Sequence, residues 1–228
     1  MQRYKGIYVI GTSHIANESV KEVEKVIKRI KPYIVALELD QKRFTMLMSG
    51  KKRKAKVADI SRLGVKGFLF NSIGAWVERR LSKVTGIAPG SEMKRAAECA
   101  REIGANIALI DQDIDVTLRK VSARMRIREK LRMISDVVTG VLLKRGNVGI
   151  DLKKVPDEKI IREMTEKVRE RYPSLYQVLI VERNEVMGKA LYKLMKMKDE
   201  EKIVAVVGAG HEREVLEVVK KEEKRELK

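Results

Sequence analysis

The stretch IVAVVGAGHE (residues 203–212) is an apolar run followed by a glycine-rich turn and a histidine. Short β-branched runs without polar alternation are typical of parallel strands that are covered on both faces. Three further segments share this character, namely residues 7–10, 33–39 (YIVALEL) and 106–110 (NIALI). We therefore expect an α/β fold with a mostly parallel central sheet of about four or more strands, flanked by helices.

Helical patterns lie between these strands. Residues 17–32 (NESVKEVEKVIKRIKP) have apolar side chains at helical spacing from Asn17 to just before Pro32. Residues 89–104 predict a second helix, with Ser91 as its N-cap and Gly104 just past its end. A third helix follows the last strand. Strands that alternate with helices favour right-handed crossover connections within one sheet.

The length of 228 residues is compatible with a single α/β domain over residues 1–228. Two stretches exceed what a crossover needs, so we expect helical elaborations at about residues 44–90 and 116–197. Pro156 and Pro173 stand at expected helix starts in the second stretch. In the first, the apolar face of Phe68–Leu81 predicts a buried helix or, as an alternative, a surface for homo-oligomers.

The amino-acid composition indicates which classes of binding partner suit this chain. An excess of 50 Lys and Arg over 32 Asp and Glu gives a net charge of +18, which suggests an anionic partner. A heat-adapted protein has the same charged composition without such a partner. Few aromatic residues and no recognisable nucleic-acid-binding motif make nucleic acid an unlikely ligand. No transmembrane run or signal peptide is apparent, so a cytoplasmic location is expected, and Cys99 is predicted to be a core residue.

The only two histidines of the chain, His14 and His211, stand in the same G-x-x-H setting (GTSH and GAGH) after an apolar run. Ligands of open α/β sheets gather beyond the carboxyl ends of the strands. Glu38 comes at the end of the second expected strand, and Asp111 is the first aspartate of the run LIDQDID (residues 109–115) at the end of the third. We therefore expect imidazoles and carboxylates to meet at one edge of the sheet.

Three interpretations of this group stay open. Two imidazoles and a carboxylate can hold a divalent metal whose bound water becomes a hydroxide. The same residues can act without a metal, with a histidine as general base and an arginine facing the oxyanion. The third interpretation is that the histidines are capping or core residues without chemistry, and that the aspartates after Ile110 cap the next helix.

Four stretches in order, GTSHIANESVKEVEKVI…PYIVALELDQKRF, PGSEMKRAAECAREIGANIALIDQDIDVTLRK, VERNEVMGKAL and VVGAGHE, resemble the signatures of the TraB/PrgY pheromone-shutdown family. The archaeal branch is the most similar. More distantly, the chain is similar to the Tiki metalloproteases and to the erythromycin-esterase/ChaN-like fold.

By position, the resemblance implies a catalytic set of His14, Glu38, Arg183 and His211, of which His14, Glu38 and His211 are the metal ligands. The Tiki branch implies metal-dependent peptide cleavage, with Mn, Co or Zn as the divalent ion, and the esterase branch implies metal-free chemistry. Supporting roles near this set are expected for Gly11, Ser13, Asp40, Arg43, Asp111, Asp113, Glu182, Asn184, Gly208 and Gly210.

The resemblance thus implies a TraB-family hydrolase of peptides. The alternative is a non-catalytic regulatory protein that binds a peptide or a membrane partner in the same pocket. Family members often continue into membrane-spanning segments, so we also expect membrane anchoring through a C-terminal region that this chain lacks. In that case Lys51–Lys56 and Met125–Arg132 are the candidates for contact with an anionic membrane surface.

Overall fold

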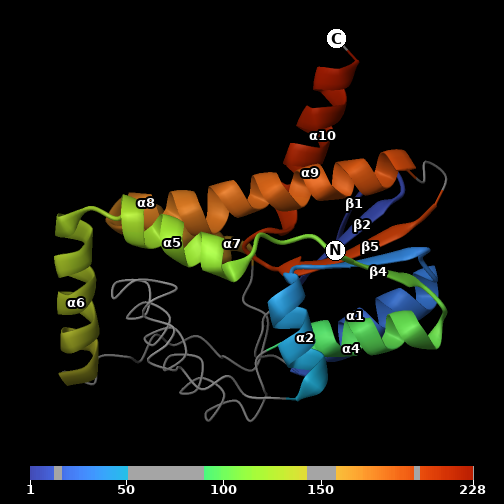
Figure 1. Ribbon diagram of the computed structural model, residues 1–228, viewed down its shortest axis with the longest axis horizontal. Helices are drawn as coiled ribbons and strands as arrows, with labels where there is room; N and C mark the ends of the chain where they lie inside the picture. Colours follow the sequence, from blue (N-terminus) through green and yellow to red (C-terminus); the bar gives the residue numbers. More distant parts are fainter. Residues whose placement is uncertain (13–16, 51–89, 143–157, 198–200, 228) are drawn as a thin grey trace.

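The computed structural model describes residues 1–12, 17–50, 90–142, 158–197 and 201–227. Within them lies a five-stranded sheet in the order β1-β2-β5-β3-β4. Four strands pair in parallel, and β1 is antiparallel to β2 (Figure 1). The expected α/β class with a mostly parallel sheet is confirmed. The strands are β1 (Gln2–Tyr4), β2 (Ile7–Thr12), β3 (Ile34–Leu37), β4 (Asn106–Leu109) and β5 (Ile203–Gly208).

The strand ends differ slightly from the sequence prediction because pairing sets them. β2 continues through Gly11 and Thr12, which pair with Val207 and Gly208 of β5. β3 is shorter than expected, since its pairing with β4 ends at Leu37. The sequence analysis missed β1, whose three residues are too few to produce a recognisable pattern.

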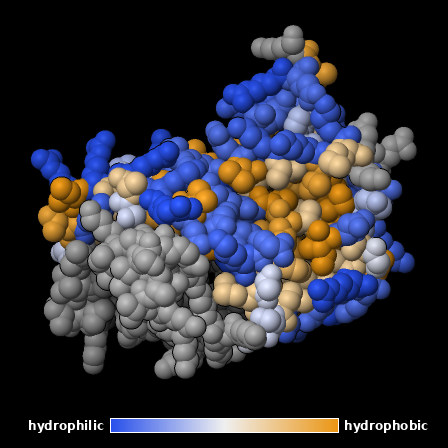
Figure 2. All heavy atoms as spheres, viewed as in Figure 1, coloured by the Kyte–Doolittle hydropathy of each residue, from blue (hydrophilic) through white to orange (hydrophobic). Residues whose placement is uncertain are grey.

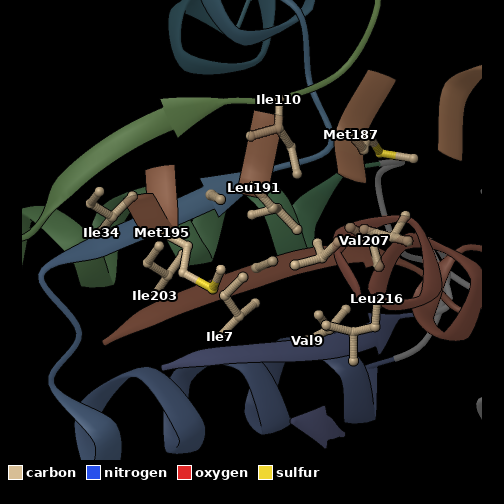
Figure 3. Packing of buried hydrophobic residues seen from close by; sticks show 14 residues of the cluster. Ile7, Val9, Ile34, Ile110, Met187, Leu191, Met195, Ile203, Val207 and Leu216 are labelled. Atoms are coloured by element: carbon tan, nitrogen blue, oxygen red, sulfur yellow. The ribbon is translucent and has the colours of Figure 1, made fainter. Parts of the chain in front are cut away.

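Helices cover both faces of the sheet (Figure 1). On one face, α1 (Asn17–Ile30) and α4 (Ser91–Glu102) bury valines, isoleucines, alanines and the thiol of Cys99 against β3 and β5. On the other face, α9 (Glu182–Met197) and α10 (Glu212–Glu226) pack on the same strands. Figure 3 shows Met187, Leu191 and Met195 of α9 in this second core cluster. The two clusters hold the sheet rigidly and so fix the strand ends.

The remaining helices are α2 (Gln41–Ser49), α5 (Ile114–Arg124), α6 (Ile127–Leu142), α7 (Glu158–Arg171) and α8 (Pro173–Tyr176), followed by the π-helical turn η1 (Gln177–Val181). α8, η1 and α9 succeed each other without a break. Figure 1 shows α5 running beside this helical run and α6 standing at the end of the molecule. None of the helices in the described ranges is long and apolar enough to cross a bilayer.

Several local predictions can be compared with these elements. Pro173 begins α8 as expected, and Gly104, with a φ of 72°, lies just past α4. Ser91 was predicted as the N-cap of α4, but it is the first helical residue and Gly90 is the N-cap. Gly90 takes this place because its φ of 81° is in the left-handed region that glycine adopts readily. The predictions for Phe68–Leu81, Lys51–Lys56 and Pro156 lie outside the described residues.

Candidate functional site

The carboxyl ends of β3, β4 and β5 meet at one edge of the sheet, where a cluster of ionisable side chains is buried. Glu38 directly follows β3, Asp111 follows β4 and His211 follows β5. Glu38 and His211 are only 5% and 6% exposed, and the side chain of Asp111 has no accessible surface. Three of the positions expected from the sequence thus come together, and with Arg183 we call them the Arg183 cluster.

Arg183, in the first turn of α9, lies between the two carboxylates. Its Nη2 is hydrogen-bonded to Glu38 Oε1 and, at 2.7 Å, to Asp111 Oδ2. Its Nε donates to Asp111 Oδ1 at 3.1 Å. Burial alone would lower the pKa of Arg183, but Glu38 and Asp111 outweigh it and hold that pKa above its ordinary value. The guanidinium is therefore a fixed positive charge in a site with little water.

Asp111 is held by two arginines. Arg43 of α2 donates from Nη2 to Asp111 Oδ2, the oxygen that also accepts from Arg183 Nη2. Burial pushes the pKa of Asp111 upward, but the hydrogen bonds and charges of the two arginines outweigh it, so the pKa lies below its usual value. Arg43 is itself held by Asp40, whose Oδ2 accepts from Arg43 Nε at 2.6 Å. Asp40 also caps α2 through the backbone N–H groups of Lys42 and Arg43. The supporting residues Asp40 and Arg43 therefore anchor Asp111.

The imidazole of His211 has one nitrogen fixed and one directed at the cluster. Nδ1 lies 2.6 Å from Asn184 Oδ1, an oxygen that only accepts, so we assign the proton to Nδ1. In this neutral tautomer Nε2 carries the lone pair. It lies 3.4 Å from Arg183 Nη1 and 3.6 Å from Glu38 Oε1. Asn184, next to Arg183 in α9, thus presents the basic nitrogen of His211 to the cluster.

The turn after β5 closes the site. Gly208 N donates to Glu38 Oε2 at 2.5 Å, and His211 N donates to Gly208 O at 2.8 Å. Thr12 Oγ1 donates to Val207 O at 3.1 Å, which joins the end of β2 to this turn. A Cβ at Gly210 would have open space around it, whereas one at Gly11 would collide with the carboxylate of Glu212. Glu38 thus has a hydrogen-bond partner for each carboxylate oxygen, Gly208 N for Oε2 and Arg183 Nη2 for Oε1.

Two of the expected supporting residues, Asp113 and Glu182, make their ion pairs outside the Arg183 cluster. Asp113 caps α5 and pairs with Lys42 at 2.8 Å, which is the capping role that the sequence left open. Glu182 pairs with Lys120 at 2.7 Å and with Arg124, both in α5. Ser13 and His14 lie outside the described residues, so the predicted meeting of the two histidines stays a prediction.

The sequence analysis missed Glu212, whose carboxylate lies against Gly11, and the only signal for it was its place directly after His211. Arg183 was predicted as a site residue only from the family resemblance, yet its position in the sequence also indicates that it is buried. It stands four residues before Met187, which with Leu191 and Met195 forms the buried stripe of α9. An arginine that continues an apolar stripe at helical spacing is a buried charge and needs an acidic partner.

The described residues do not by themselves fit a divalent metal ion. His211 Nε2 and Glu38 Oε1 are close enough to share one ion, but Arg183 contacts both of them. In the described parts of the chain, no group of three or more His, Cys, Asp or Glu side chains is arranged to hold a metal. The metal set predicted from the sequence thus depends on His14 and on displacement of Arg183.

The chain as a whole matches a known protein family. The model of the TraB/PrgY/gumN family matches residues 2–228. An archaeal protein described as uncharacterized, MJ1365 of Methanocaldococcus jannaschii, is 35% identical over 94% of this chain and 53% of its own length. TraB domain-containing proteins of Bos taurus and Homo sapiens are 25% and 24% identical, each over 90% of this chain and 60% of their own length.

This chain therefore spans little more than half the length of the curated relatives that it matches. The family match covers nearly all of its residues, including those that form the Arg183 cluster. The expected resemblance is confirmed, and the chain belongs to the TraB/PrgY/gumN family.

Proposed function

We propose that this chain is a hydrolase of peptides in which His211 acts as general base and Arg183 stabilises the oxyanion. The observation that carries the proposal is the orientation of His211. Asn184 fixes its Nδ1, and its Nε2 is directed at the cluster, 3.4 Å from Arg183 Nη1 and 3.6 Å from Glu38 Oε1. A neutral imidazole with a directed lone pair next to a fixed cation is the pairing that acyl hydrolysis needs.

The contact between Nε2 and Nη1 is the weakest one that Arg183 makes with the cluster. Its five N–H groups point at Asp111, Glu38, Leu179 O and His211. A water and a carbonyl group that enter between Arg183 and His211 open this long contact. Nη1 then faces the carbonyl oxygen, while Glu38 and Asp111 hold the guanidinium in place.

The reaction follows from this arrangement. The water oxygen forms a bond to the carbonyl carbon and gives one proton to His211 Nε2, and the carbonyl oxygen becomes an oxyanion next to Arg183. When the carbon–nitrogen bond breaks, the proton passes from Nε2 to the leaving amine. Asn184 Oδ1 stabilises the imidazolium through Nδ1–H during the transfer. Peptides are proposed as the substrate class because the resemblance to the Tiki metalloproteases implies peptide cleavage.

The test is mass spectrometry of a peptide mixture incubated with the purified chain, with and without added Mn²⁺, Co²⁺ or Zn²⁺. We expect cleavage that the His211→Gln variant loses by about 10²–10⁴-fold. Lys120→Met, which changes a charge outside the cluster, serves as the control.

Metal content of the purified protein separates the two chemistries. Stoichiometric metal that is lost from a His14→Ala/His211→Ala variant, with turnover only when metal is present, would replace the metal-free route by the metal-dependent one. Retained turnover in both single histidine variants would end the proposal that the histidines carry the hydrolysis.

A second candidate is a non-catalytic binding protein, because every polar atom that Glu38 and Arg183 direct at the cluster already has a partner. A satisfied buried network is as suitable for recognising a peptide as for cleaving one. In that case the His211→Gln variant changes the affinity for a peptide, measured by titration calorimetry, and no product forms.

A further inference from the structure

The corner formed by the end of α5 and the start of α6, residues 124–132, combines exposed apolar and basic side chains. Ile127 and Leu131 are 75% and 63% exposed and stand one helical turn apart on the same side of α6. In Figure 1 this corner lies at the end of the molecule farthest from the sheet. Figure 2 shows apolar and hydrophilic side chains side by side at that end. We call residues 124–132 the basic corner.

The charge of the basic corner is mostly positive at its surface, although Arg124 is paired with Glu182 of α9. Its one acidic residue, Glu129, is 4% exposed and accepts hydrogen bonds from the backbone N–H groups of Arg126 and Ser174 at 3.0 Å. Glu129 is therefore used in holding the corner together and does not balance the charge outside. The basic residues are Arg124, Arg126, Arg128, Lys130 and Arg132.

An open cavity of about 250 Å³ adjoins the basic corner. It is lined by Arg124 and Arg126 of the corner together with Pro173, Ser174 and Gln177. Two guanidinium groups, a hydroxyl and an amide are the groups that bind a phosphate. The cavity thus offers a place for one anionic headgroup beside the exposed apolar pair.

We propose that the basic corner docks onto an anionic phospholipid surface. Ile127 and Leu131 enter the boundary between headgroups and acyl chains, as the apolar face of an interfacial helix does. The arginines contact lipid phosphates, with Arg124 and Arg126 receiving one headgroup in the cavity. This inference is independent of the proposed hydrolase activity, since none of these residues belongs to the Arg183 cluster.

Charge and exposure together favour this occupant over two others. A second copy in a symmetric dimer would bring an identical basic corner against the first, and like charges would oppose the contact. Nucleic acid would pair with the arginines but would leave Ile127 and Leu131 without a role. A lipid surface satisfies both kinds of side chain at once.

The test is co-sedimentation of the purified chain with vesicles of phosphatidylcholine, with and without phosphatidylglycerol. We expect binding only to the anionic vesicles. Each arginine removed contributes about 1 kcal/mol, or roughly fivefold in affinity, so Arg126→Glu/Arg128→Glu weakens binding by at least about 25-fold. Ile127→Ser/Leu131→Ser weakens it by about tenfold or more without changing the charge.

Matched controls are available on other surfaces. Lys21→Glu/Lys25→Glu makes the same change of charge on exposed positions of α1, and Met197→Ser removes an apolar side chain that is 75% exposed. Both should bind like the wild type. The proposal is overturned if the wild type ignores anionic vesicles, or if the controls weaken binding as much as the corner variants. It is also overturned if a DNA duplex binds as well as the vesicles and Ile127→Ser/Leu131→Ser binds both equally, which would indicate a purely electrostatic surface.

Discussion

Replacement of Arg183 by methionine tests whether the cluster is a buried charge network. Arg183→Met keeps much of the side-chain volume but leaves Glu38 and Asp111 without their shared cation. The side chains of these carboxylates are 4% and 0% exposed, and that of Arg183 is 15% exposed. Removal of one partner from such a buried pair typically costs about 3–5 kcal/mol. We expect a loss of this size in the free energy of unfolding at neutral pH.

The pH dependence of stability should change sign in the variant. In the wild type the pKa of Asp111 is lowered. Its contribution to stability is therefore present above the unfolded pKa of about 3.9 and is lost as the pH falls through the folded value. Without Arg183, only Arg43 opposes burial, the largest single influence on the pKa of Asp111, so we expect that pKa to rise above its ordinary value. The folded variant then binds more protons than the unfolded chain, so it gains stability as the pH falls from 7 towards 5.

Urea denaturation followed by circular dichroism at pH 7, 6 and 5 measures both effects. Arg124→Met is the control, since the Arg124 side chain is 53% exposed and its pair with Glu182 should contribute no more than about 1 kcal/mol. If Arg183→Met unfolds too readily at pH 7, the recovery of its folded signal at pH 5 still reports the sign. A loss below about 1 kcal/mol with an unchanged pH profile would refute the buried network.

Three further predictions concern the surroundings of the cluster. Gly188→Ala should destabilise the fold by about 1–3 kcal/mol in urea, because a Cβ there would lie 2.5 Å from Val218 of α10. Asn184→Leu leaves the buried Nδ1–H of His211 without its acceptor, so we expect a loss of about 1–3 kcal/mol and an altered ¹⁵N tautomer signal. Cys99 is buried in the core and its pKa is raised by burial, so a thiol reagent should modify it only as fast as the chain unfolds.

Each of these three predictions has its own control variant or reference measurement. Lys189→Ala, on the exposed side of α9, should stay within about 0.5 kcal/mol of the wild type, and equal losses in both variants would contradict the close approach of α9 to α10. A His211→Gln variant assigns the imidazole signal, and an unshifted signal in Asn184→Leu would remove Asn184 from its positioning role. Modification of Cys99 at the same rate with and without urea would show that the thiol is accessible in the folded state.

The sequence predicts the sheet well because its signal is local. The runs around Val35 and Val206 are β-branched and apolar, and both form buried parallel strands. The edge of the sheet that carries Glu38 and His211 follows from the same runs, since parallel strands end together. Strand ends were less accurate, because the partner strand decides whether residues such as Thr12 are paired.

The contacts within the site could not be predicted in the same way. The hydrogen bond that His211 donates to Asn184 depends on the rotation of α9, which is set by packing of the helix on the sheet. The π-helical turn before Glu182 also shifts this rotation, and nothing in the residues Gln177–Val181 marks a π turn. The helix register that brings Arg183 over the strand ends is therefore a tertiary effect.

The helix register places Arg183 on the side of α9 that faces the sheet, where a charged residue is unusual. The stripe of Arg183, Met187, Leu191 and Met195 faces the sheet, and an apolar residue in the first position would pack there without any need for acidic partners. Apolar replacements of buried ion pairs are often neutral or stabilising, because removing charges from water is costly. The fold instead places a π turn before the arginine, and Leu179 O in that turn accepts a hydrogen bond from Arg183 Nη1 at 3.2 Å. A buried ion network that apolar residues together could replace, held by a rare backbone geometry beside a directed imidazole, is better explained by chemistry or recognition at this site than by the needs of folding.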